Sequence, residues 1–85
     1  MGSASWNSKD WKKFNRELGK RLEISRSDKG VSESRAEFDT GISRASIYRY
    51  EKGLTFPTAK NLRKLAEYYN ASPSWLLGYE ADWEE

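Results

Sequence analysis

The sequence predicts a small all-α domain, a five-helix bundle built from short helices. Its 85 residues suffice for one domain but not for two. Apolar residues recur at helical spacing, while capping residues and glycines divide the chain at short intervals. No hairpin turn signal and no internal repeat interrupts this pattern.

The first predicted helix begins near Asp10 and ends near Asp28. Its apolar stripe consists of Trp11, Phe14, Leu18 and Leu22. Either Ser8 or Asp10 can accept a hydrogen bond from the free amides at its start. The Lys29-Gly30 pair supplies a basic last turn and a glycine stop. Residues 1–8 are predicted to be a disordered leader or a remnant of cloning.

Two short helices follow, separated by a glycine. Ser32 is predicted to cap a helix that runs to Thr40, and Gly41 to end it by adopting a positive φ. Ser43 is predicted to cap the next helix, over residues 44–52. The helix, glycine turn and helix together form the pattern of a helix-turn-helix unit.

The last two predicted helices also carry clear end signals. Thr58 is a cap for the fourth helix, and Asn70 suits its left-handed C-terminal position. Its inner face consists of Leu62, Leu65, Ala66 and Tyr69. Ser72-Pro73 opens a short fifth helix that Gly78 closes. The helix-turn-helix domain is therefore expected over residues 9–78, followed by an acidic tail over residues 79–85.

The composition argues against several classes of function. The chain has no cysteine and no histidine, which removes the usual metal ligands and the nucleophile pairs that depend on histidine. No apolar run approaches the roughly 18 residues of a membrane span. We therefore expect a protein that is not an enzyme, with no cofactor, no metal site and no membrane contact. Its expected location is the cytoplasm, as bacterial cytosol or nucleoid.

Charge is distributed unevenly along the chain. The net charge is only +2, but residues 79–85 contain four acidic side chains and no basic one. Between residues 43 and 64, six basic side chains stand against one acidic side chain. A basic body with an acidic end suggests a polyanionic partner. The alternative is an ordinary solvated helical surface.

The helix over residues 44–52 is predicted to have two different faces. Ile42 just before it, and Ile47 and Tyr50 within it, are expected to be buried. The opposite face carries Arg44, Ala45, Tyr48 and Arg49. The DNA major groove is about 12 Å wide and admits one helix, and the arginine fork matches two acceptors of guanine.

These properties predict a DNA-contacting surface that includes the loop after this helix. The predicted contact residues are Ser43, Arg44, Ala45, Ser46, Tyr48, Arg49, Lys52 and Thr55. Lys52 and Thr55 lie at the end of this helix and in the loop after it, where we expect the DNA phosphates to run. The alternative for the arginines is plain solvent exposure, and for the serines simple helix capping.

Residues 18–78 resemble the DNA-binding domain of the lambda-repressor/Cro family, also called XRE-type helix-turn-helix. The resemblance rests on LGKRLEISRSDKGVS, TGISRASIYRYEKG and FPTAKNLRKLAEYYNASPSWLLG. It implies a bundle that reads operator DNA, usually as a homodimer. It also implies base contacts from Arg44, Ala45 and Arg49, backbone or base-edge contacts from Ser43 and Ser46, and a bracing pair between Arg26 and Glu51.

The function that we expect is sequence-specific binding of double-stranded DNA by a transcriptional repressor of phage or mobile-element type. Such a protein acts by occupying its operator, and an anti-repressor is a candidate protein partner. The alternative is a protein-binding adaptor or antitoxin that keeps the fold, since fold alone does not determine function.

The second predicted helix departs from the family pattern. A leucine-alanine pair is usual where this chain has Ala36 and Glu37, and Phe38 follows where a polar residue is expected. The helix either rotates so that Phe38 enters the core, which we favour, or exposes Phe38 as a partner surface. Similarly, Ser25 occupies a usual leucine position beside Ile24.

The remaining aromatic residues are divided between core and surface. Those predicted to pack inside are Trp11, Phe14, Tyr50, Tyr69 and Trp75. Phe56 and Tyr48 are predicted to lie at the surface. Trp83 belongs to the acidic tail and supports the adaptor alternative.

Overall fold

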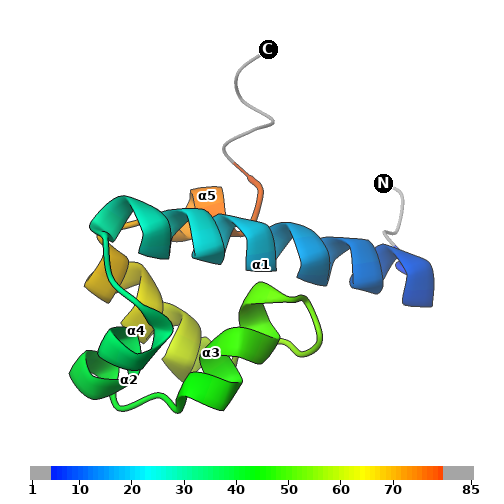
Figure 1. Ribbon diagram of the computed structural model, residues 1–85. Helices are drawn as coiled ribbons and strands as arrows, with labels where there is room; N and C mark the ends of the chain where they lie inside the picture. The colour runs from blue at the N-terminus through cyan, green and yellow to red at the C-terminus, as the bar shows by residue number, and fades with distance from the viewer. Residues whose placement is uncertain (1–4, 80–85) are drawn as a thin grey trace.

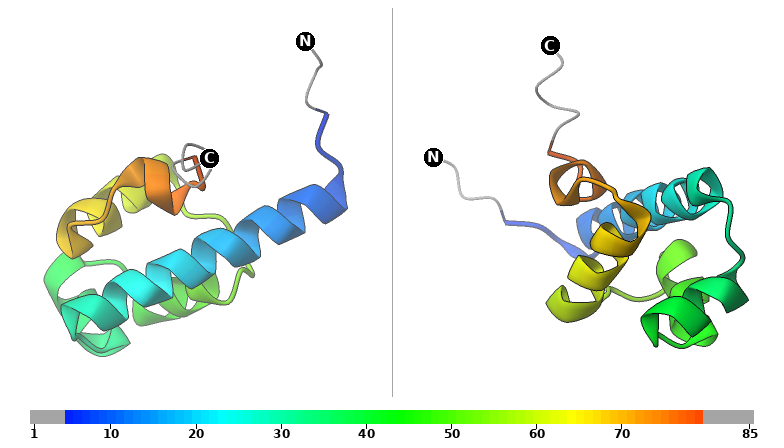
Figure 2. Two further views of the ribbon diagram at one scale, coloured as in Figure 1. Left: turned by 90° about the horizontal axis from the view of Figure 1, so that it is seen from above. Right: turned by 90° about the vertical axis from the view of Figure 1, so that its left-hand side faces the viewer.

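The computed structural model describes residues 5–79 and is all-helical there, so the predicted five-helix fold is confirmed. Its helices are α1 (Ser8–Lys29), α2 (Glu33–Thr40), α3 (Arg44–Glu51), α4 (Ala59–Tyr69) and α5 (Pro73–Leu76). The long α1 crosses one side of the bundle, with α2 and α3 on one flank and α4 and α5 on the other (Figures 1 and 2). Among these residues, no helix is both long and apolar enough to cross a membrane.

Side-chain caps fix the beginning of each helix. Three predicted N-caps are confirmed: Ser32, Ser43 and Thr58 each accept a hydrogen bond from a backbone N–H three residues ahead. Ser72, at the predicted start of the fifth helix, caps α5 in the same way. The predicted cap of α1 was wrong, because Asn7 occupies that position. The Asn7 side chain accepts a bond from the Asp10 N–H, and the Asp10 carboxylate accepts one from the Asn7 N–H, each at 3.0 Å. This reciprocal pair satisfies two otherwise free donors and starts α1 earlier than predicted.

The core lies where α1, α3, α4 and α5 meet. Its most completely buried large side chains are Leu18, Leu22, Ile47, Leu65 and Leu76. Tyr50 and Tyr69 are buried as predicted, and Phe14 and Trp75 pack half-buried against this core. The prediction failed for Trp11, which is 44% exposed. The first turns of α1 extend past the bundle (Figure 1). The Trp11 ring packs at the surface against Trp6, Phe14 and Phe56, with ring centroids 4.6, 5.8 and 5.9 Å away.

The second helix does not rotate to bury Phe38, so the alternative that we favoured was wrong. Phe38 is 79% exposed, Glu37 is also exposed, and Ala36 is fully buried. The small Ala36 side chain allows α2 to pack closely against α3 and α4. Turning Phe38 inward would move Ala36 out of this contact. No carboxylate of α2 therefore needs to be buried.

Ser25 is buried at the position where the family usually has leucine. Its hydroxyl donates to the Arg21 carbonyl at 2.9 Å, so its polar atom is satisfied within α1. This hydrogen bond removes the main cost of a buried hydroxyl.

Candidate nucleic-acid interface

A tight turn joins α2 to α3 and sets the angle between them. Gly41 has a φ of 80°, in the left-handed region that favours glycine. The Thr40 hydroxyl donates to the Ala36 carbonyl at 2.7 Å and accepts from the Ile42 N–H at 3.1 Å. These two bonds tie the end of α2 to the turn. Ile42 then enters the core and anchors the start of α3.

The third helix has the two faces that its sequence predicts. Ile47 is 1% exposed and Tyr50 is also buried, with the Tyr50 hydroxyl accepting a bond from the Asn61 side-chain amide at 2.9 Å. The outward face consists of Arg44, Ala45, Tyr48 and Arg49, all of them exposed. The buried contacts fix the rotation of α3, so its outward face is held in place by the core.

An open groove of about 670 Å³ runs along this outward face. Its lining residues are Glu33, Glu37, Ser43, Arg44, Ala45, Tyr48, Arg49 and Leu54. Five of the eight predicted contact residues therefore lie together in one groove between α2, α3 and the loop that follows α3. Neither groove arginine has an acidic partner within residues 5–79. Arg44 only reaches the Ser34 hydroxyl, at 3.5 Å.

The other three predicted residues lie beside this groove. Ser46 is half-buried, and its hydroxyl accepts a bond from the Ser43 hydroxyl at 3.0 Å. Lys52 is exposed at the end of α3, with its ammonium 5.7 Å from the centre of the Tyr48 ring. Thr55 is half-buried in the following loop. Ser43 also caps α3, so its side chain has a structural role whatever else it contacts.

Sequence reasoning missed three residues of the groove. Glu33 and Glu37 line it from α2, one turn apart on the same side of that helix. Leu54 is 67% exposed and reaches it because its N–H donates to the Arg49 carbonyl at 2.9 Å, which folds the loop back onto α3. The spacing of the two glutamates was visible in the sequence. The direction of the loop was not.

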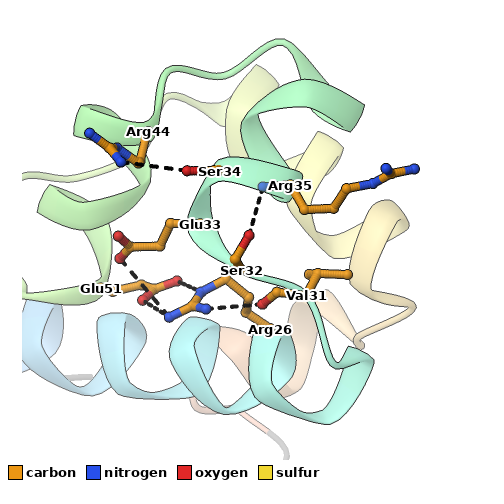
Figure 3. A network of polar contacts seen from close by, with 8 residues as sticks. All are labelled: Arg26, Val31, Ser32, Glu33, Ser34, Arg35, Arg44 and Glu51. Carbon is orange, nitrogen blue, oxygen red and sulfur yellow. Dashed lines mark hydrogen bonds and ion pairs between the residues drawn. The ribbon is translucent and has the colours of Figure 1, made fainter.

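A polar network behind the groove joins α1 to α2 and α3 (Figure 3). The Arg26 guanidinium donates to both carboxylate oxygens of Glu51, at 2.7 and 3.0 Å, and to the Val31 carbonyl at 3.0 Å. Glu33 lies 4.0 Å from the same guanidinium. The hydrogen bond to Glu51 raises the pKa of Arg26 above its usual value. The Arg26–Glu51 pair is the one that the family resemblance implied, and it holds α1 against the end of α3.

A second polar tie joins α2 to α4. The Tyr68 hydroxyl donates to the Asp39 carboxylate at 2.6 Å, and Arg35 pairs with the same carboxylate at 3.0 Å. The bond from Tyr68 lowers the pKa of Asp39. The Lys64 ammonium donates to the Thr40 carbonyl at 3.1 Å. These contacts fix the outer side of α2.

The groove combines cationic, phenolic and small apolar side chains. Within residues 5–79, no three acidic side chains gather closely enough to hold a metal ion. The groove instead presents two arginine forks, a phenol and a methyl group on a helix of major-groove width.

Comparison with known proteins agrees with this geometry. Residues 28–76 match a family model described as Helix-turn-helix, which covers more than half of the chain and contains α2, α3, α4 and α5 entirely. No curated protein gives a match to the chain. The chain belongs to the lambda-repressor/Cro-like, XRE-type helix-turn-helix family of DNA-binding transcription regulators.

Proposed function

We propose that this protein binds a specific double-stranded DNA operator and represses transcription by occupying it, as phage or mobile-element repressors do. One observation supports this most directly: α3 buries Ile47 while it exposes Arg44 and Arg49, without acidic partners, in an open groove. Exposed cations held on a rigid helix suit base edges and phosphates. Occupancy requires no chemical step.

The proposed roles follow from where each side chain lies. Arg44 and Arg49 read base edges, because a planar fork can pair with guanine O6 and N7. Ala45 allows close approach and can contact a thymine methyl group. Tyr48 adds a phenol to the same face. The backbone contacts are assigned to Ser43, Ser46, Lys52 and Thr55.

The proposed binding species is a homodimer. One α3 helix of 8 residues can reach only a few base pairs. Two copies related by a twofold axis would place their α3 helices in successive major grooves, about 34 Å apart. The operator is then expected to be palindromic.

Selection from random DNA duplexes is the first test, because it requires no known operator. Recovery of a palindromic consensus would support both specific readout and a dimer. Arg44→Ala and Arg49→Ala should then each weaken binding to that consensus by about 1–3 kcal/mol and relax the preference at one position. Arg63→Ala on α4 removes the same charge and serves as the control. Circular dichroism should be unchanged in all three variants.

A second candidate is a protein-binding adaptor or antitoxin with this fold. The observation that favours it is Phe38, which is 79% exposed on α2. Large exposed apolar side chains can mark a protein contact. Unchanged DNA affinity in both the Arg44→Ala and the Arg49→Ala variant would favour this candidate, and so would a selection that recovers no consensus.

A further inference from the structure

Five cationic side chains line one face of α1. They are Lys9, Lys12, Lys13, Arg16 and Lys20, named here the α1 stripe. At about 100° per residue they fall within roughly 100° of arc around the helix. All five are exposed, and they lie opposite the buried Leu18 and Leu22. The stripe ends where Glu23 takes its place on the same face.

None of these cations forms an ion pair with the rest of the described chain. The ion pairs within residues 5–79 involve Arg26, Arg35 and Arg63, and no member of the α1 stripe. Asp10, the nearest acid at the start of α1, is already bonded to the Asn7 backbone. Glu17 lies one turn from Lys13 on the edge of the stripe and forms no ion pair with it. The stripe therefore presents unneutralised positive charge.

The stripe borders the loop that follows α3. A side-chain carbon placed on Gly53 would lie 2.9 Å from the Arg16 Cα, so the two backbones are in direct contact there. Lys52 and Thr55, which we assign to phosphates, flank Gly53 in this loop. The first turns of α1 extend beyond the loop and the rest of the bundle (Figures 1 and 2). The stripe thus continues a phosphate-contacting edge outward.

The length of the stripe suits a DNA backbone. From Lys9 to Lys20 the helix rises about 16 Å, at about 1.5 Å per residue. A duplex carries roughly ten phosphates over that length. Four of the five cations are lysines, which act as point charges and have no fork to match a base edge. This composition suits contact with phosphates without regard to sequence.

We propose that the α1 stripe is a second contact with the phosphate backbone of the bound duplex, outside the base pairs that α3 reads. The inference rests on the proposed DNA-binding function. It implies a footprint longer than the selected consensus. It also implies that flanking DNA adds affinity and salt dependence without adding specificity.

The test removes three stripe charges and spares Arg16, because Arg16 packs against Gly53. The variant is Lys12→Gln/Lys13→Gln/Lys20→Gln. The matched control, Lys29→Gln/Arg63→Gln/Lys64→Gln, removes the same charge beside α4: Lys29 lies over the Tyr68 ring, and Arg63 and Lys64 belong to α4. Affinity is measured over a range of salt concentrations. Two duplexes are used, one with the selected consensus in long flanks and one trimmed to the consensus.

For the long duplex, the stripe variant should lower the slope of log affinity against log salt by about 2 to 3, or about 0.9 for each lost phosphate contact. Its affinity should fall about tenfold while the selected consensus stays the same. The trimmed duplex should show little difference between wild type and the stripe variant. The control should keep most of the wild-type slope on both duplexes.

Three results would overturn the proposal. The first is an unchanged slope in the stripe variant while Arg44→Ala loses operator binding, which would leave the proposed function standing. The second is an equal loss of slope in variant and control, which would mean that only total charge matters. The third is tighter DNA binding by the stripe variant, which would mean that the stripe does not contact the phosphates of the duplex. Absence of any wild-type DNA binding would instead refute the proposed function itself.

Discussion

The Arg26 guanidinium forms a two-pronged hydrogen bond with the Glu51 carboxylate, at 2.7 and 3.0 Å, and this contact holds α1 against the end of α3. The Glu51 side chain is 3% exposed, so its charge is almost removed from water. The same guanidinium donates to the Val31 carbonyl in the turn before α2. One side chain thus joins α1 to the turn before α2 and to the end of α3, and α2 and α3 are the two helices that line the groove.

Arg26→Ala should destabilise the domain by about 3–5 kcal/mol, because it leaves a buried carboxylate without its partner. Urea denaturation followed by circular dichroism measures this loss as a lower midpoint at an unchanged slope. The double variant Arg26→Met/Glu51→Leu should lose less than Arg26→Ala alone, since no buried charge is left unpaired.

The Arg63–Glu67 pair provides the control for burial. Its Nε–Oε2 distance is also short, 3.0 Å, but the two side chains are 82% and 66% exposed. Arg63→Ala should therefore cost no more than about 0.5 kcal/mol. A similar loss in Arg26→Ala and Arg63→Ala would show that the buried pair has no special structural role.

Gly19→Ala should destabilise the domain, although glycine-to-alanine changes inside a helix usually stabilise by about 0.5–1 kcal/mol. A Cβ at this position would clash with the backbone carbonyl oxygens of Tyr50 and Glu51. Backbone atoms of α3 cannot give way cheaply, so we expect a loss of about 1–3 kcal/mol or more. Thermal unfolding measures it, and a raised melting temperature would contradict the close contact between α1 and α3.

Most of the fold could be predicted from the sequence because its signals are local. Ser32, Ser43 and Thr58 cap their helices through contacts three residues away, and such contacts depend only on the neighbouring chain. The rotation of α2 could not be predicted in this way. It depends on how closely Ala36 approaches α3 and α4, which is a tertiary distance. The prediction that Trp11 is buried failed for a related reason. Helical spacing shows which residues share a face of a helix, but it does not show where the bundle behind that face ends.

Phe38 provides a test of that rotation. Phe38→Ser should change stability by no more than about 0.5 kcal/mol, because the ring is exposed and buries little apolar surface. Ala36→Leu should cost about 1–3 kcal/mol, because the fully buried site has no room for a larger side chain. Urea midpoints compare the two variants. The opposite order of losses would mean that Phe38, and not Ala36, faces the core.

The basic face of the groove could be predicted from α3 alone, but its acidic wall could not. Glu37 lines the groove opposite Arg44 and Arg49, since α2 lies directly beside α3. Its carboxylate repels phosphates and can accept a bond from a cytosine amino group. The sequence placed Glu37 correctly on α2. Only the crossing of the two helices brings it to the same groove as the arginines.

Glu37→Gln should therefore strengthen binding to random-sequence duplexes about fivefold, the effect of removing roughly 1 kcal/mol of repulsion in water. Binding to the selected consensus should improve less, so the ratio between the two affinities should fall. Fluorescence anisotropy on both duplexes measures this ratio. Glu67→Gln on α4 is the control and should leave the ratio unchanged. If Glu37→Gln and Glu67→Gln change this ratio of affinities equally, Glu37 does not lie in the DNA interface.

The bond from Tyr68 to Asp39 predicts a defined acid dependence of stability. Because this bond lowers the pKa of Asp39 in the folded state, the unfolded chain binds more protons at acid pH. The contribution is present above the unfolded value of about 3.9 and is lost as the pH falls through the lower, folded value. The Tyr68→Phe variant lacks the hydroxyl whose hydrogen bond is the largest cause of the lowered Asp39 pKa. The variant should be less stable than the wild type at neutral pH, and this difference should narrow between about pH 5 and pH 2.

Melting temperatures measured across that pH range check this prediction. Tyr48→Phe is the control, because the Tyr48 hydroxyl is exposed and donates to no carboxylate among the described residues. The melting temperature of Tyr48→Phe should differ from that of the wild type by the same amount at every pH. The prediction is contradicted if the difference in melting temperature between Tyr68→Phe and the wild type stays constant down to the lowest pH. The Tyr68 hydroxyl would then stabilise the fold without stabilising the charged form of Asp39.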